Sequence, residues 1–230
     1  IGPEGCGKTT TYILAVLMRL KYAFEDAPRA LILVPSREKV LETVSQFEAL
    51  GRNTDLRVLG LVPGGGMQDQ RDDLFEGVDI VVGTPDRVNT IYINSGLNIN
   101  KIQMFIMDDV EYIIKQGYQG IIHRFKDGLP KCQKLAFSEV YHDKLDQLVS
   151  KVMNVEAVVE VEAEVEREIE IHNQEVYSVL NYKTKLNLLN LLVDREGFDK
   201  LVIFSNSRLT AGQLYTTVSK RQEGVCAMLN

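Results

Sequence analysis

The sequence has no tryptophan, and its 230 residues include only three cysteines and six prolines. The cysteines lie far apart, without a Cys-x-x-Cys pair or a histidine at metal-ligand spacing, so we expect reduced thiols in an intracellular setting and no zinc site. No stretch approaches the roughly 18 consecutive apolar residues that a membrane-spanning helix needs, so no membrane partner is expected.

The chain also lacks an excess of positive charge. It has 26 Lys and Arg against 32 Asp and Glu, for a formal net charge of −6, so binding to nucleic acid would need a local basic patch. The N-terminus has neither an initiator Met nor the basic start and apolar stretch of a signal peptide, and we expect a fragment of something longer. The apolar share of 45% is ordinary for a globular protein.

Short apolar runs alternate with segments of helical spacing, which predicts an α/β fold with a parallel sheet and crossover helices. The expected strands are Leu31–Val34, Leu56–Val62, Val78–Val82, Ile102–Met107 and Lys134–Phe137. The expected helices are Thr9–Tyr22, Arg37–Leu50, Asp69–Phe75, Pro85–Ile93 and His142–Lys151.

The composition changes between Val155 and Ile171, where glutamates alternate largely with Val, Ala and Ile. A period of two predicts an extended strand with one solvated, acidic face that runs into a linker. A helix would stack like charges four residues apart, and an acidic docking surface is a further alternative. We expect a first domain over 1–155, a linker over 156–176 and the start of a second domain over 177–230.

A second α/β unit begins after the linker. It is predicted from the apolar stretch Tyr177–Leu180, a helix at Lys183–Asp194, a strand at Leu201–Ser205 and a helix at Arg208–Arg221. About 50 residues are too few for a domain of this type, so we expect this unit to be truncated.

Residues Gly2–Thr9 match the phosphate-loop pattern G-x-x-x-x-G-K-[ST] in full, and an apolar helix follows. Backbone N–H groups of such a loop hold phosphates, Lys8 reaches the β- and γ-phosphates, and the Thr9 hydroxyl can bind Mg²⁺. The predicted nucleotide ligands are Gly5, Cys6, Gly7, Lys8, Thr9 and Thr10. The strand that normally leads into such a loop is missing from the sequence.

Asp108 follows the apolar strand Ile102–Met107 and is the expected second ligand of Mg²⁺, because ligands of parallel sheets bind at the carboxyl ends of the strands. The alternative is that Asp108 and Asp109 cap the following helix.

The order of the motifs resembles the DEAD-box RNA helicases of superfamily 2. The matching segments, after the phosphate loop, are Pro35-Ser36-Arg37-Glu38, Gly64-Gly65, Thr84-Pro85-Asp86-Arg87, Asp108-Asp109-Val110-Glu111, Ser138-Glu139-Val140 and Val202–Ser207. The resemblance implies two RecA-like domains with helices on both sheet faces, ATP and Mg²⁺ as cofactors, and RNA as the partner, held as a single strand by its backbone.

The resemblance also implies residue roles. Lys8, Asp108, Asp109 and Ser138 are the expected catalytic residues, with Thr9 and Asp108 on the metal. The expected RNA-binding residues are Pro35, Arg37, Gly64, Gly65, Thr84 and Arg87, and Lys39 is a further basic residue for the same purpose.

Several residues depart from the family pattern. Asp109 stands where the family has the Glu that orients the attacking water, and Glu111 replaces the last Asp of D-E-A-D. Glu139 replaces the Ala of S-A-T, and Asp86 replaces the Gly of T-P-G-R, at a helix start where a carboxylate competes with an RNA phosphate or acts only as a cap. Slowed hydrolysis is the expected result.

Three functions remain open at this point: an RNA-dependent ATPase, a helicase-like clamp that turns over slowly or not at all, and an interaction scaffold. The intact phosphate loop argues against the last. The divergence resembles the helicase-like regions of Tudor-domain proteins in the piRNA pathway, which implies a larger ribonucleoprotein assembly, protein partners through a longer chain, and a cytoplasmic location in granules.

Overall fold

The computed structural model describes residues 1–24, 26–94, 96–153, 157–161, 175–193, 200–220 and 226–228. The chain divides into two compact units, Ile1–Glu166 and Arg167–Asn230. None of the helices in these described ranges has the length and apolar content that crossing a membrane requires.

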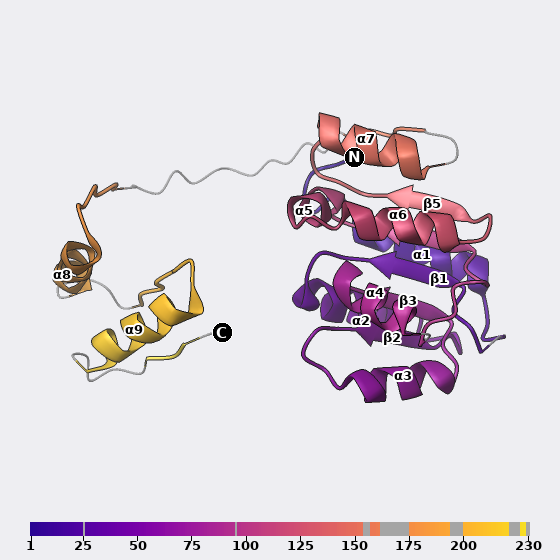
Figure 1. The fold of residues 1–230 in the computed structure, drawn as a ribbon, viewed down its shortest axis with the longest axis horizontal. Helices are drawn as coiled ribbons and strands as arrows, with labels where there is room; N and C mark the ends of the chain where they lie inside the picture. Colours follow the sequence, from indigo (N-terminus) through magenta and orange to yellow (C-terminus); the bar gives the residue numbers. More distant parts are fainter. Residues whose placement is uncertain are drawn as a thin grey trace. The chain divides into compact units, whose positions relative to one another are not determined.

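A five-stranded parallel sheet forms the centre of the first unit (Figure 1). Its strands are β1 (Ala30–Leu33), β2 (Val58–Leu61), β3 (Ile80–Gly83), β4 (Met104–Met107) and β5 (Gln133–Ala136), in the spatial order β2-β3-β1-β4-β5. Leu31 in β1 lies beside Val81 of β3 and Phe105 of β4. All five strands predicted for this unit are confirmed: β2, β3 and β4 are shorter than their apolar runs, and β1 and β5 begin one residue earlier than predicted.

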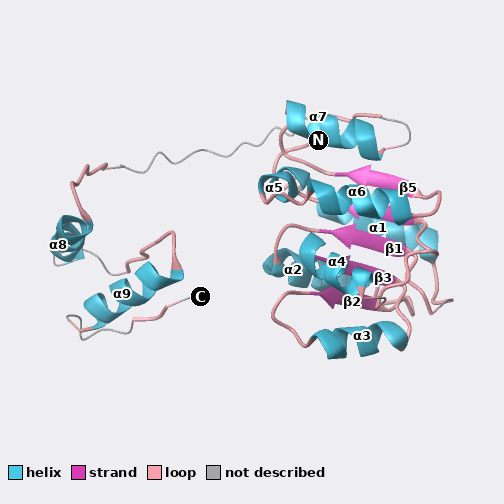
Figure 2. Ribbon diagram, viewed as in Figure 1, coloured by secondary structure: helices cyan, strands magenta, loops and turns pink. Residues whose placement is uncertain are grey.

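Helices cover both faces of this sheet (Figure 2). One face packs against α1 (Lys8–Leu20) and α2 (Arg37–Leu50). The other carries α3 (Met67–Phe75), α4 (Pro85–Ile93), α5 (Val110–Lys115), α6 (Gln119–Gly128) and α7 (Asp143–Val152). The predicted α/β fold with helices on both faces is therefore confirmed. The sequence analysis missed α5 and α6, and α5 has only six residues.

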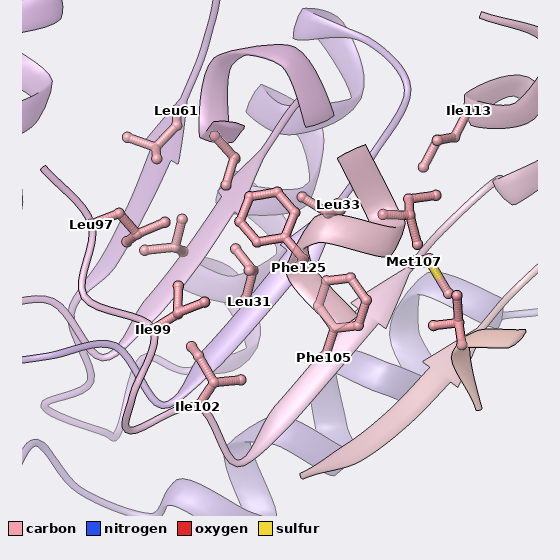
Figure 3. Close-up of a cluster of buried hydrophobic side chains, with 14 of the residues drawn as sticks. Leu31, Leu33, Leu61, Leu97, Ile99, Ile102, Phe105, Met107, Ile113 and Phe125 are labelled. Carbon is pink, nitrogen blue, oxygen red and sulfur yellow. The ribbon is translucent and has the colours of Figure 1, made fainter. Parts of the chain in front are cut away.

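Alternate residues of each strand enter the two apolar cores. Leu31 and Leu33 of β1 lie in one cluster with Phe105 and Phe125, shown in Figure 3, whereas Ile32 belongs to the cluster on the opposite face. Covering both faces explains why the central strands β1, β3 and β4 are apolar throughout rather than alternating with polar residues.

The strands β1 and β4 are neighbours, and the order in which the strands are added to the sheet changes direction between them. The helix that follows β1, α2, packs on one face, and the helices that follow β4, α5 and α6, pack on the other. Diverging helices leave a crevice at the carboxyl ends of two such strands, which is where parallel sheets bind ligands.

The chain start lies against two later segments. The Gly2 N–H donates to the Ser138 carbonyl (3.0 Å), Ile1 donates to the Val159 carbonyl (2.7 Å), and the Val161 N–H donates to the Ile1 carbonyl (2.9 Å). The first part of the glutamate-rich segment is thus paired along its backbone, without forming a regular strand. The rest of it, over 162–174, lies outside the described residues.

The second unit contains α8 (Tyr182–Val193) and α9 (Arg208–Ser219), close to the two predicted helices. The predicted strand at Leu201–Ser205 is wrong for this structure, because no strand is assigned there. A strand needs a neighbour for its N–H and C=O groups, and the described part of this unit offers none. Val202 and Phe204 are accordingly 74% and 91% exposed.

Candidate active site

The loop that precedes α1 is shaped by glycines in the left-handed region. Gly5 has φ 82° and Gly7 has φ 88°, a conformation that other residues rarely adopt. Gly7 is the N-cap of α1, so the first N–H groups of this helix point out of the loop without a side-chain cap. Such a helix start binds anions through its free N–H groups and its dipole.

Lys8 is the first residue of α1, and its ammonium group turns back over the loop. Nζ donates to the Gly2 carbonyl (2.7 Å) and the Pro3 carbonyl (2.9 Å), and lies 3.7 Å from Glu139 Oε1. The lysine thus stands at the mouth of the loop, where the sequence places it for phosphate binding.

Asp108 lies at the carboxyl end of β4 and is 1% exposed. Its Oδ2 accepts hydrogen bonds from the Thr9 hydroxyl and the Tyr12 hydroxyl, both at 3.1 Å. Burial raises the pKa of Asp108, against the charge of Lys39 and the two hydroxyl donors. The structure therefore brings together the two predicted metal ligands, Thr9 and Asp108, from positions 99 residues apart.

This donor pair suits Mg²⁺, which prefers oxygen ligands and usually takes one or two from protein side chains, with water and phosphate completing its shell. The described residues hold no group of three or more His, Cys, Asp or Glu that could bind a metal unaided. A buried carboxylate that accepts only from two hydroxyl groups and the Asp109 backbone N–H, all neutral donors, fits a cation bound together with a phosphate.

Asp109 is the N-cap of α5 and adopts the left-handed region, with φ 50° and ψ 50°. Burial, followed by the neighbouring Asp108 charge, raises the pKa of Asp109 to about 6. Its Oδ2 lies 3.8 Å from Lys39 Nζ on α2, so this ion pair joins the segments that follow β1 and β4. Asp109 thus occupies the N-cap position, but its side chain makes no capping hydrogen bond to α5.

Ser138 follows β5 and is 2% exposed. Its hydroxyl lies 2.7 Å from Glu111 Oε2, to which it donates, and the Glu139 N–H donates to Glu111 Oε1 (3.0 Å). Glu111 thereby ties the start of α5 to the turn after β5. Ser138 contacts Glu111, and its predicted catalytic role stays a prediction.

The other predicted nucleotide ligands lie in the loop or at the start of α1. Gly5 and Thr10 are exposed, and Cys6 is half-buried. A Cβ on Gly2 would lie 2.7 Å from Cys6 Sγ, so the loop closes tightly at its beginning.

The predicted RNA-binding residues follow β1, β2 and β3, which are adjacent, and so they share the carboxyl edge of the sheet. A Cβ on Gly64 would lie 3.4 Å from Arg37 Nη1. Arg87 donates to the Gly65 carbonyl (2.8 Å) and to Gln70 Oε1 (2.9 Å). The Arg87 guanidinium therefore stabilises the turn that contains Gly64 and Gly65.

The remaining two of these residues lie nearer the strands. Thr84 caps α4 from a buried position, and the Pro35 carbonyl accepts from Gln116 Nε2 (3.1 Å). The structure gathers the predicted set along one edge, and its contact with RNA stays a prediction.

Two residues of the site have contacts that the sequence did not indicate. Lys39, grouped above with the RNA-binding residues, pairs with Asp109 and with Glu42 (3.7 Å), and its contact with RNA stays a prediction. Tyr12 was not recognised as part of the site. A signal was available, because a tyrosine on the buried face of an apolar helix needs a partner for its hydroxyl.

Comparison with known proteins decides the family. Residues 1–148 match the family model described as DEAD/DEAH box helicase, which is more than half of the chain. The chain belongs to the DEAD/DEAH box helicase family.

Relatives within the family cover most of this chain. It is 30% identical over 205 residues to the ATP-dependent RNA helicase DHH1 of Meyerozyma guilliermondii, covering 89% of this chain and 37% of that protein. It is 29% identical over 212 residues to the ATP-dependent RNA helicase eIF4A of Eremothecium gossypii, covering 92% of this chain and 53% of that protein. The chain thus spans only part of the length of these relatives.

Solved structures agree on the fold. A DEAD box protein from Methanococcus jannaschii superposes with a TM-score of 0.66 at 21% identity, over 95% of this chain and 58% of that one. The yeast DEAD-box splicing factor Prp28 gives a TM-score of 0.64 at 20% identity, over 97% and 54% of the two chains. The expected RecA-like fold of a DEAD-box protein is confirmed, and the resemblance to Tudor-domain proteins stays a prediction.

Proposed function

We propose that this protein is an ATP-dependent RNA helicase of the DEAD-box type whose ATP hydrolysis is slowed by its own substitutions. The observation that carries the proposal is the hydrogen bond from the Thr9 hydroxyl to Asp108 Oδ2 (3.1 Å). It lies beside a complete phosphate loop, at the carboxyl end of β4 next to β1. The relatives named as ATP-dependent RNA helicases support it. Because this chain spans only part of their length, the activity is proposed for the whole protein.

In this proposal the loop Gly2–Thr9 and the first turn of α1, with Thr10, hold the phosphates of ATP through backbone N–H groups. Lys8 leaves the carbonyls of the loop to contact the β- and γ-phosphates. Thr9 and Asp108 would hold Mg²⁺, which neutralises phosphate charge as the reaction proceeds. Tyr12 orients the Asp108 carboxylate through its hydrogen bond.

Asp109 takes the position of the group that orients the attacking water. Its side chain is one methylene shorter than the family's Glu, and Lys39 Nζ holds its carboxylate at 3.8 Å. Short reach and a competing ion pair both weaken water positioning, so hydrolysis is slowed rather than lost. The alternative of a degenerate scaffold is not favoured, because the relatives are named as helicases.

RNA would lie across the carboxyl edge formed after β1, β2 and β3, as a single strand held by its backbone. The predicted piRNA assembly, the protein partners within a longer chain and the cytoplasmic granules belong to the same proposal. Recovery of RNA and proteins crosslinked to the intact protein in cells tests these points.

Calorimetric titration of the intact protein with ATP and Mg²⁺ tests nucleotide binding. We expect Lys8→Ala to weaken ATP binding about 100-fold, because hydrogen bonds from charged groups contribute the most to phosphate binding. Lys131→Ala is the matched control, since this exposed lysine precedes β5 at the other end of the sheet. Equal affinities for wild type and Lys8→Ala would refute the nucleotide site.

RNA-stimulated release of phosphate from ATP tests the second half of the proposal. We expect a slow rate that RNA increases and that Asp108→Asn abolishes. A hydrolysis rate that is independent of RNA would refute the helicase activity and support only an ATPase activity.

A further inference from the structure

We infer that Glu139 determines the nucleotide preference of this site, because its carboxylate competes with the terminal phosphate of a nucleoside triphosphate for Lys8. The result is a lower affinity for ATP relative to ADP than the phosphate loop alone would give. The inference rests on the proposed function, in which Lys8 binds phosphate.

The geometry places the carboxylate at the phosphate-binding lysine. Glu139 Oε1 lies 3.7 Å from Lys8 Nζ, and the two side chains are 33% and 10% exposed. An ammonium group has three hydrogens to donate, and two of them already bind the carbonyls of Gly2 and Pro3. When Lys8 leaves these carbonyls to bind phosphate, the phosphate oxygens that replace them lie beside the Glu139 carboxylate and compete with it for the ammonium group.

Hydrogen bonds to Glu111 and to Gly2 hold the backbone at Ser138 and Glu139. The Glu139 N–H donates to Glu111 Oε1, the Ser138 hydroxyl donates to Glu111 Oε2, and the Ser138 carbonyl accepts from the Gly2 N–H. The base of the Glu139 side chain is thus held against the phosphate loop itself. Only rotation of its side chain can remove the carboxylate, so a bound phosphate must either displace it or face its charge.

The surrounding charges leave little to compensate for that repulsion. Asp108, Asp109 and Glu111 are near enough for their charges to repel one another, and the second lysine of the site, Lys39, is paired with Asp109 and Glu42. Lys8 contacts the β- and γ-phosphates, and a triphosphate brings one more charged phosphate to this region than a diphosphate does. Glu139 consequently penalises ATP more than ADP.

The test compares ATP and ADP affinities for the intact wild-type protein and its Glu139→Gln variant, by calorimetry with Mg²⁺ present. Glutamine keeps the shape and removes the charge. We expect ATP to bind about fivefold more tightly and ADP to change less than about twofold, which is the range for a partly exposed ion pair. The gain should shrink as salt is raised from 0.05 to 0.5 M, because salt screens the charge that was removed.

Glu76→Gln is the matched control, because it removes one negative charge from an exposed position at the end of α3, before β3. It should leave both affinities unchanged. Glu139→Asp keeps the charge with a shorter reach and should fall between wild type and Glu139→Gln. Unfolding midpoints without nucleotide identify any variant with a damaged fold.

The outcomes separate this inference from the proposed function. If Lys8→Ala weakens ATP binding but Glu139→Gln leaves the ATP-to-ADP ratio unchanged, the inference is overturned and the nucleotide site stands. Weaker ATP binding by Glu139→Gln also overturns it, because the carboxylate would then assist the nucleotide. If wild type binds neither nucleotide, the proposed function falls and takes the inference with it.

Discussion

Both ends of the same sheet bury an aspartate, and the two carboxylates differ in their partners. Asp79, before β3, has no exposed surface and accepts from Arg29 Nη2 (2.8 Å), Arg57 Nε (2.9 Å) and the Arg57 N–H (3.0 Å). Asp108, after β4, accepts from the hydroxyl groups of Thr9 and Tyr12 and from the Asp109 N–H (3.1 Å).

The partners of Asp79 reverse the effect of burial on its pKa, whereas those of Asp108 do not. Burial raises the pKa of both, but the hydrogen bonds and charge of Arg57 and Arg29 outweigh it at Asp79 and lower its pKa. The pKa of Asp108 stays raised, because a more remote lysine and three neutral donors compensate less for burial. A buried acid with two arginines is a structural element, whereas one with hydroxyl partners retains the capacity to bind a cation.

The largest expected effect comes from Asp79→Asn. This change leaves the buried Arg29 without its countercharge, so the free energy of unfolding should fall by about 3 kcal/mol. Asp108→Asn removes an undercompensated charge and should leave stability unchanged or raised, while ATP hydrolysis is lost. Urea unfolding of both variants at pH 7 measures the contrast. Equal losses of stability at the two positions would break the comparison.

Asp109→Glu should raise the hydrolysis rate about 10-fold, because the restored methylene brings the carboxylate toward the attacking water. The affinity for ATP should remain nearly unchanged, since this group acts in the transition state rather than in binding. Single-turnover hydrolysis with saturating RNA is the measurement, and Asp109→Asn is the negative control. A flat rate would shift the cause of slow turnover to Glu111 or Glu139.

Low pH should destabilise the folded protein through protonation of Asp79. Its pKa is lower in the folded protein than in the unfolded chain, so the stability that it contributes is complete above the unfolded value of about 3.9. That contribution is lost as the pH falls through the folded pKa. Unfolding free energies of wild type should therefore drop below about pH 4 more steeply than those of Asp79→Asn. Parallel curves would show that the arginines do not stabilise the charged form.

The smallest effect is expected at the carboxyl edge of the sheet, which we propose to bind RNA. Asp86 is exposed in the first turn of α4, where its charge would oppose an RNA phosphate bound at the helix start. Asp86→Gly should tighten RNA binding by about threefold and steepen the slope of log affinity against log salt by up to about one counterion. If affinity and slope both stay constant, this turn does not contact RNA.

Much of the fold was predictable because its signals are local. The helices α2 and α4 have the predicted bounds, since Ser36 caps the first with its side chain and Pro85 opens the second. The short helix α5 was missed, since six residues give too little periodicity. The strand predicted at Leu201–Ser205 has the right residues but no pairing neighbour in the described part of its unit.

The sequence by itself determined the phosphate loop, the strand that presents Asp108 and the family, because these depend on short spacings and on turn residues. The tertiary structure alone decided which charges meet: Glu139 with Lys8, Lys39 with Asp109, and Asp79 with its two arginines. These partners come from separate strands and helices, so no local pattern relates them. Burial then sets their effect, because the same carboxyl group has a lowered pKa beside arginines and a raised one beside hydroxyl groups.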